Sequence, residues 1–453
     1  MALYLVVGLV LHFSLRTNAY DLSLFDYALW NSLRGRLGWV PFIGHSIFSE
    51  HFMPILFVLT PVYALWQSPV ALIVIQLLAV LTAALLLIAL MRSERLDTFA
   101  TCVIVLVFLI SRPSFLAVNS FFYPESLQPA LVFASLLAWR AGRFRTYWVC
   151  LILLLMTKED ASLFVGSFAI IQWFLEPTRR LKSAITFVIA VAWFTAAIAI
   201  AIPYSRAIDG LPSMNHFINA RYGTADGSIV ASGLVSRVLS VQSATTLLNV
   251  LLPFGLLSLG GPELLAVIGP ALIVNLAANQ DTLQAAVSGH YLWPMLPWIA
   301  AGAVRGYRRL KDMVPRFAIV WCAMIGIATI VSSPIVRNSR RFIVDPAARV
   351  TLDQLPATAG LTLASQPNLV PHLTHDNRVM AVGHDVASLH DYDVVLLTTV
   401  GDTWPFSTEE ILGLVEKCSR DPAFDKVVSG PLFVFRRSPT TKRLPAIPTS
   451  ATQ

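Results

Sequence analysis

Three adjacent ionisable residues, Lys158, Glu159 and Asp160, interrupt an apolar stretch of the sequence. If residues 146–175 formed one helix, the basic clusters on either side of it would lie on opposite faces of a membrane, against the rule that short basic loops stay cytoplasmic. Two helices joined by a charged turn are therefore predicted. The first would be about 18 Å long at about 1.5 Å per residue, short of a hydrocarbon core of about 30 Å. The turn is thus expected at membrane depth.

A second acidic turn is expected below the outer surface of the membrane. The helix predicted for residues 127–139 would be only about 20 Å long, and it follows Glu125 directly. An unpaired charge in lipid costs several kcal/mol. Two acidic turns below the membrane surface therefore indicate a water-filled cavity, which often marks a functional pathway. The alternative is that Lys158 simply pairs with Glu159 or Glu125.

Asp21 and Asp26 flank the start of a probable helix within residues 22–33. Carboxylates there can bind a cation or act as a general base. The alternative is that Asp21 caps the helix and Asp26 complements its dipole.

Other side chains expected on the outer side suggest ligand or metal binding. His45, Glu50 and His51 are suitable in type for a divalent metal, the one cofactor that the residues suggest, although their spacing matches no specific motif. His290 and Tyr291 begin a later apolar segment and would either contact substrate or anchor a helix at the interface.

Two arginines are candidate phosphate ligands. Arg206 and Arg221 lie in an outer segment predicted for residues 203–242, and each guanidinium offers a fork of donors that matches phosphate oxygens. The alternative is that they are solvated loop charges in contact with anionic headgroups.

The composition excludes a soluble protein. The 453 residues are 56% hydrophobic and 13% charged, whereas soluble domains carry about a quarter charged residues. The net charge of +7 does not indicate nucleic-acid binding, because many basic residues cluster between apolar runs, as in cytoplasmic loops. The four cysteines are scattered and predict neither disulfides nor a metal site. Membrane lipid is the expected partner.

A mainly α, polytopic membrane fold is therefore predicted, with a transmembrane domain over residues 1–335. The first segment lacks the features of a signal peptide, and its shortness is compatible with a missing natural N-terminus. The loops at 92–95, 140–145, 179–182, 261–263 and 305–311 are expected to be cytoplasmic, since four of these five are basic. About eleven spans are expected, near residues 1–15, 70–91, 99–117, 127–139, 146–157, 161–175, 184–202, 244–259, 263–278, 289–304 and 316–333.

Long non-membrane segments complete the organisation. Residues 16–69 form a first outer loop, with interfacial or re-entrant helices. Residues 336–436 predict a small extracytoplasmic α/β domain, because short β-rich runs alternate with a helix whose capping box is Ser407 and Glu410. The last residues, 437–453, are rich in Pro, Thr and Ser and predict a disordered tail.

Several motifs, in the same order along the chain, resemble the bacterial membrane family called domain of unknown function 2079. They are Tyr20 to Asn31, Glu50 to Phe52, Tyr123 to Glu125, Lys158 to Asp160, Ser288 to Tyr291 and Gln366 to Leu373. The resemblance covers nearly the whole chain.

The architecture of that family is similar to GT-C glycosyltransferases, which use polyprenyl-phosphate sugars. This similarity implies that Asp21 is the catalytic base, with Asp26 in support, although the loop has no Asp-x-Asp motif. Lys158, Arg206 or Arg221 would then neutralise the leaving phosphate. The competing hypotheses are a transporter or lipid-binding protein that uses the buried charges as a relay, and an inactive scaffold whose C-terminal domain recruits partners.

Overall fold

The computed structural model describes residues 2–223, 229, 231–279, 282–337, 343–357, 360–373, 375, 378–383, 389–428 and 430–438. The chain forms two compact units. Unit 1 comprises Met1–Ile47, Leu59–Val74 and Arg340–Gln453, and unit 2 comprises Phe48–Val58 and Ile75–Ser339. Most of the first outer segment, residues 16–47 and 59–69, therefore belongs with the C-terminal part of the chain, whereas the sequence suggested a single boundary near residue 335.

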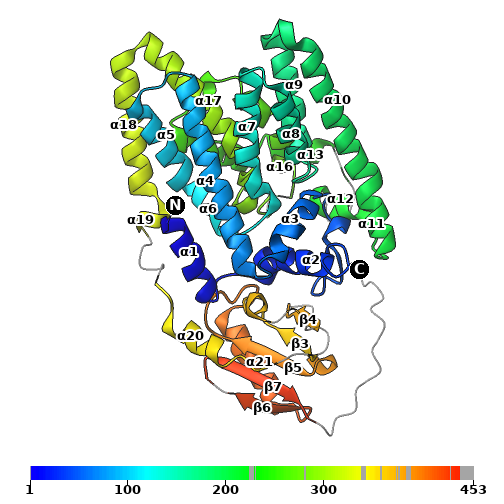
Figure 1. The fold of residues 1–453 in the computed structure, drawn as a ribbon. Coiled ribbons are helices and arrows are strands. Elements are labelled where there is room, and N and C mark those ends of the chain that lie inside the picture. Colours follow the sequence, from blue (N-terminus) through cyan, green and yellow to red (C-terminus); the bar gives the residue numbers. More distant parts are fainter. Residues whose placement is uncertain are drawn as a thin grey trace. The chain divides into compact units, whose positions relative to one another are not determined.

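Unit 2 consists of helices, many of which run alongside one another (Figure 1). Two further helices, α3 (Ile55–Ala64) and α4 (Pro69–Ser93), each contribute residues to both units. The helices of unit 2 are α5 (Thr98–Ile110), α6 (Arg112–Asn119), α7 (Gln128–Arg140), α8 (Phe144–Leu155), α9 (Ala161–Leu175), α10 (Arg180–Ala196), α11 (Ile202–Ile208), α12 (Met214–Tyr222), α13 (Ala231–Val238), α14 (Val241–Leu251), α15 (Leu264–Ile268), α16 (Pro270–Leu276), α17 (Leu296–Met313), α18 (Pro315–Ser332) and α19 (Pro334–Arg337).

Within the described residues, three helical segments are long and apolar enough to cross a membrane: Pro69–Ser93, Pro177–Ile208 and Pro315–Arg337. Two bent pairs, Thr98–Ile110 with Arg112–Asn119 and Ser232–Val238 with Val241–Phe254, raise the number to five if each is one span. The expected eleven spans are not confirmed, because helices such as α8 and α9, with 12 and 15 residues, are too short to pass this test.

An ion-pair network joins four of the five loops predicted to be cytoplasmic. Glu94 pairs with Arg140 and Arg308 at 2.6 Å each. Glu263 pairs with Arg140 at 3.2 Å and with Arg305 at 3.0 Å. These loops therefore meet at one end of unit 2. Because α8 begins next to Arg140 and runs away from it, the charged turn after α8 lies toward the opposite end.

In unit 1, a five-stranded sheet with the strand order β4-β3-β5-β7-β6 is formed by the C-terminal part of the chain (Figure 1). β3 pairs in parallel with β4 and β5, and β7 pairs antiparallel with β5 and β6. The elements of this part are α20 (Pro346–Asp353), β3 (Thr362–Ser365), β4 (Arg378–Ala381), β5 (Val394–Thr398), α21 (Thr408–Arg420), β6 (Phe424–Val428) and β7 (Leu432–Arg437).

The predicted sheet region and its capping box are confirmed. The Glu410 N–H donates to Ser407 Oγ at 3.2 Å and the Ser407 N–H donates to Glu410 Oε2 at 2.7 Å, which is the predicted capping box. Ile411 on α21 packs against Leu397 and Phe435 of the sheet in one buried core. The predicted tail lies outside the described residues from 439 onward.

The N-terminal part of unit 1 contains residues 16–47 of the first outer segment. It comprises α1 (Ala2–Phe13), the π-helix η1 (Ala19–Ser23), α2 (Leu24–Ser32) and a short hairpin of β1 (Trp39–Val40) and β2 (His45–Ser46). The helix predicted near residues 22–33 is therefore confirmed. Asn18, rather than Asp21, caps η1, since its side chain accepts a hydrogen bond from the Tyr20 N–H at 3.1 Å.

Candidate functional site

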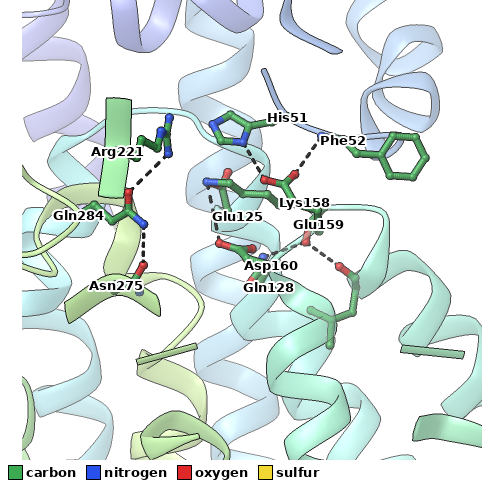
Figure 2. Close-up of polar contacts among 12 residues, drawn as sticks. His51, Phe52, Glu125, Gln128, Lys158, Glu159, Asp160, Arg221, Asn275 and Gln284 are labelled. Carbon is green, nitrogen blue, oxygen red and sulfur yellow. Dashed lines mark hydrogen bonds and ion pairs between the residues drawn. The ribbon is translucent and has the colours of Figure 1, made fainter. Parts of the chain in front are cut away.

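The charged turn between α8 and α9 is the centre of the candidate site. Lys158 is buried, and its Nζ donates to Glu125 Oε1 at 2.7 Å (Figure 2). Asp160 Oδ2 lies 3.9 Å from the same nitrogen, and the Tyr291 ring lies 5.5 Å away. The pairing of Lys158 with Glu125, one of the alternatives from the sequence, is confirmed. Burial alone favours the neutral amine, but the nearby carboxylates, Glu125 above all, outweigh it and raise the pKa of Lys158.

Glu159 ties the turn to the segment before α3. Its carboxylate contacts His51 Nδ1 at 2.8 Å and accepts a hydrogen bond from the Phe52 N–H at 2.9 Å (Figure 2). Burial opposes ionisation of Glu159, but His51 outweighs it, so the pKa of this carboxyl is lowered. Glu159 is therefore ionised, and each of its two carboxylate oxygens has a partner in the segment before α3.

Asp160 differs from its two acidic neighbours. It stands at the N-cap position of α9, yet its side chain forms no capping hydrogen bond. Its Oδ1 is buried without a hydrogen-bond partner among the described residues. The side chain as a whole keeps 31% of its exposure and lines a pocket. Asp160 therefore retains acceptor capacity that the fold does not use.

A polar network stands near this turn. Arg221 Nη1 donates to Gln284 Oε1 at 3.5 Å, a long hydrogen bond. Gln284 Nε2 in turn donates to Tyr222 Oη at 3.0 Å and to Asn275 Oδ1 at 3.4 Å. Figure 2 shows Arg221, Gln284 and Asn275 grouped near the charged turn. Gln284 thus connects the Arg221 guanidinium to Tyr222 and Asn275.

These residues share one cavity of about 640 Å³ in unit 2. Its polar lining comes from the charged turn, from Glu50 and His51, and from Arg221, Tyr222, Asn275, Gln284 and Tyr291. Its apolar lining comes mostly from α10 to α13 and the segments between them: Phe194, Ile198, Ile202, Met214, Ile218, Leu234, Val235, Val238 and Leu239. The cavity thus combines charged side chains with a larger set of apolar side chains in one lining.

Three residues predicted to bind substrate do not line this cavity: Glu125, Arg206 and His290. Arg206 is buried and donates to the carbonyls of Pro212 at 2.7 Å and Ser49 at 3.1 Å. Its guanidinium therefore links the segment after α11 to the segment before α3. The His290 ring stacks on Tyr123 with 3.9 Å between centroids.

The predicted base and its supporting carboxylate lie in unit 1. Asp21 is half-buried in η1. Asp26 is 2% exposed, accepts a hydrogen bond from the Tyr63 hydroxyl and contacts His375 Nε2 at 2.5 Å. Trp30 stacks on the His375 ring at 5.2 Å between centroids. Asp26 therefore does more than complement a helix dipole, since it joins three separate segments of unit 1.

The divalent-metal site suggested by His45, Glu50 and His51 stays a prediction. His45 belongs to unit 1 and the other two residues to unit 2. Within the described part of the chain, no group of three or more His, Cys, Asp or Glu side chains is arranged to hold a metal ion.

Sequence reasoning missed several residues of the site. Gln284 and Asn275 were not singled out, although a lone asparagine within an apolar run, as at Asn275, is a usable signal. Tyr63 and His375 carry no such signal, because their partner Asp26 is 37 and 349 positions away.

Comparison with known proteins places the chain in a family. No curated protein and no solved structure matches it. A family model described as "Predicted membrane protein (DUF2079)" matches residues 11–425, and the chain therefore belongs to this family of membrane proteins.

Proposed function

We propose that the cavity of unit 2 binds a polyprenyl-phosphate sugar and that the protein transfers the sugar to an acceptor on the non-cytoplasmic side of the membrane. The observation that carries this proposal is one cavity whose mostly apolar lining also includes several charged side chains. Few soluble metabolites present both surfaces, whereas a lipid phosphate does.

The apolar lining suits an isoprenoid chain. Its side chains are branched aliphatic residues, Phe194 and Met214, and they come largely from one continuous part of the sequence. Burial of hydrocarbon contributes about 25 cal/mol per Å² of apolar surface. An isoprenoid laid along this lining would therefore supply most of the binding free energy.

The polar lining suits the phosphate and the sugar. Arg221 lines the cavity and can form a bidentate contact with phosphate oxygens. Lys158 adds a second positive charge, which is buried, although Glu125 already accepts one of its donors. The amide groups of Gln284 and Asn275 offer hydrogen bonds of the kind that orient sugar hydroxyls.

The proposed reaction is an inverting displacement at the anomeric carbon. The bond from the acceptor oxygen to this carbon forms, the bond from the carbon to the phosphate oxygen breaks, and the acceptor proton passes to a carboxylate base. The base that the family similarity implies is Asp21, with Asp26 in support. The multi-pass topology of about eleven spans and an extracytoplasmic C-terminal domain belong to the same proposal.

The full-length protein in lipid nanodiscs provides the test. Radiolabelled undecaprenyl-phosphate hexose should bind saturably, and wild type should release undecaprenyl phosphate. Arg221→Ala should weaken donor binding by about 10-fold, a loss of about 1.4 kcal/mol, whereas Arg309→Ala, outside the cavity, should not. Failure of wild type to bind or cleave the labelled donors would contradict the proposal.

A transporter is the second candidate, favoured by the buried row of Glu125, Lys158 and Asp160. Such rows relay protons in membrane proteins. This function would be favoured over sugar transfer if proteoliposomes took up protons without cleaving the donor and if Lys158→Met abolished the uptake.

A further inference from the structure

Three carboxylates surround Lys158, and two of them are already committed to the fold. Glu125 is 1% exposed and accepts the Lys158 ammonium at 2.7 Å. Glu159 contacts His51 and the Phe52 N–H. Either carboxylate would have to give up a buried partner before it could accept a proton from a substrate, and an unpaired buried partner is costly.

The third carboxylate, Asp160, is not committed to the fold in this way. Asp160 stands 3.9 Å from the Lys158 Nζ, which is beyond hydrogen-bonding distance but close enough for attraction. It does not cap α9, and its Oδ1 has no hydrogen-bond partner among the described residues. The partly exposed side chain lines the same cavity as Arg221. A substrate in that cavity would meet an acidic group with unused lone pairs.

We propose that Asp160 is the general base of the transfer and accepts the proton of the acceptor hydroxyl. This inference rests on the proposed function. As the acceptor oxygen forms its bond to the anomeric carbon, the O–H proton moves to Asp160. The phosphate leaves with the electron pair of the broken C–O bond, and Arg221 stabilises its charge. Lys158, held in place by Glu125, compensates the negative charge of ionised Asp160 before the transfer.

The environment of Asp160 supports this role. Burial raises the pKa of its carboxyl to about 7. Glu159 and Glu125 act in the same direction, whereas Lys158 and the backbone N–H of Ala161 oppose it. A base is most effective when its pKa lies near the working pH. The remaining titratable or charged groups around the cavity are Glu50, His51, Arg221, Tyr222 and Tyr291.

This assignment differs from the one implied by family similarity, which gives the base as Asp21. Asp21 belongs to unit 1, whereas every residue that lines the cavity belongs to unit 2. Asp160→Asn therefore tests the new assignment, because turnover retained in this variant would leave Asp21 as the base. The exposed Asp312 on α17 offers a matched control, since Asp312→Asn removes an equal charge far from the charged turn in the fold.

The experiment measures donor affinity and undecaprenyl phosphate release for each full-length variant in nanodiscs, with radiolabelled undecaprenyl-phosphate hexose as the probe. Removal of a general base costs about 100-fold or more in rate. Asp160→Asn should lose this much turnover and keep the wild-type donor affinity. Asp312→Asn should retain turnover within about 3-fold of wild type.

A pH profile gives a readout that a structural role would not change. Wild-type turnover should fall as the pH drops through about 7, because protonated Asp160 cannot accept a proton. Asp160→Glu should keep part of the activity, and the pH at which turnover falls on the acidic side should differ from that of wild type. The residual rate of Asp160→Asn should show no such fall in turnover at acidic pH.

Three outcomes would overturn the inference and leave the proposed function standing: turnover of Asp160→Asn within about 3-fold of wild type, loss of donor affinity in parallel with its turnover, or an Asp160→Glu profile identical to wild type. If wild type itself neither binds nor cleaves the donor, the proposed function fails first. Monodispersity and melting temperature of each variant establish that it is folded.

Discussion

Replacement of Lys158 by Met tests how strongly the buried ion pair holds the charged turn. Methionine keeps a similar chain length and removes the ammonium. The change leaves Glu125, which is 1% exposed, without its partner at 2.7 Å. The other oxygen of this carboxylate, Oε2, already has no hydrogen-bond partner among the described residues. Loss of one partner of a buried pair typically costs about 3–5 kcal/mol.

The assay is thermal unfolding of the purified protein in one detergent, followed by intrinsic fluorescence. A loss of 1 kcal/mol lowers the melting temperature by about 2 °C in a domain of this size, so Lys158→Met should lower it by roughly 6–10 °C. Removal of both charges is often close to neutral. The double variant Lys158→Met/Glu125→Gln should therefore recover at least half of the loss.

Two results would refute this reasoning. A shift below about 1 °C in Lys158→Met would mean that the pair contributes little to stability. A double variant whose loss equals the sum of the two single losses would mean that Lys158 and Glu125 are not coupled.

Three further predictions concern other parts of the chain. His375→Ala should destabilise unit 1 by about 1–3 kcal/mol, because it leaves buried Asp26 with one partner fewer; equal melting temperatures would contradict this. Asp160→Asn should stabilise the protein more at pH 8 than at pH 5, since burial raises the pKa of this carboxyl and its ionisation at high pH opposes folding; an equal effect at both pH values would exclude it. In a cysteine-free background, Gly210→Cys should react with an impermeant thiol reagent outside intact cells and Arg143→Cys should not; the reverse pattern would invert the predicted topology.

The local features of the C-terminal sheet could be predicted because each is encoded within a few residues. The capping box needs only Ser407 and Glu410, three positions apart. The short β-rich runs likewise predict strands without knowledge of the rest of the fold. Residue pairs so close in sequence are largely independent of how distant segments pack.

The charged turn was predicted for a similar reason, since Lys158 to Asp160 are adjacent and break an apolar run. The partner of each charge was not determined by the sequence. Glu125 was one of two candidates for Lys158, and the structure selects it at 2.7 Å. The His51 contact of Glu159, across 108 positions, depends on helix packing that no local pattern encodes.

The grouping of the first outer segment with the C-terminal part is the main feature that sequence reasoning missed. A change in composition near residue 335 suggested one boundary between two consecutive domains. The contacts of Asp26 with Tyr63 and His375 show instead that unit 1 is assembled from separate stretches of the chain. The composition of a segment indicates whether it lies in lipid or in water, but not which other segments it packs against.

Photo-crosslinking gives the most direct test of the claim that the cavity of unit 2 holds a polyprenyl phosphate. Undecaprenyl phosphate with a diazirine in its isoprenoid chain would be irradiated with the full-length protein in nanodiscs, and the labelled peptides would be identified by mass spectrometry. The account predicts saturable labelling of α10 to α13, competed by unlabelled undecaprenyl phosphate and reduced in Arg221→Ala. Labelling that is not saturable, or that spares these helices, would contradict it.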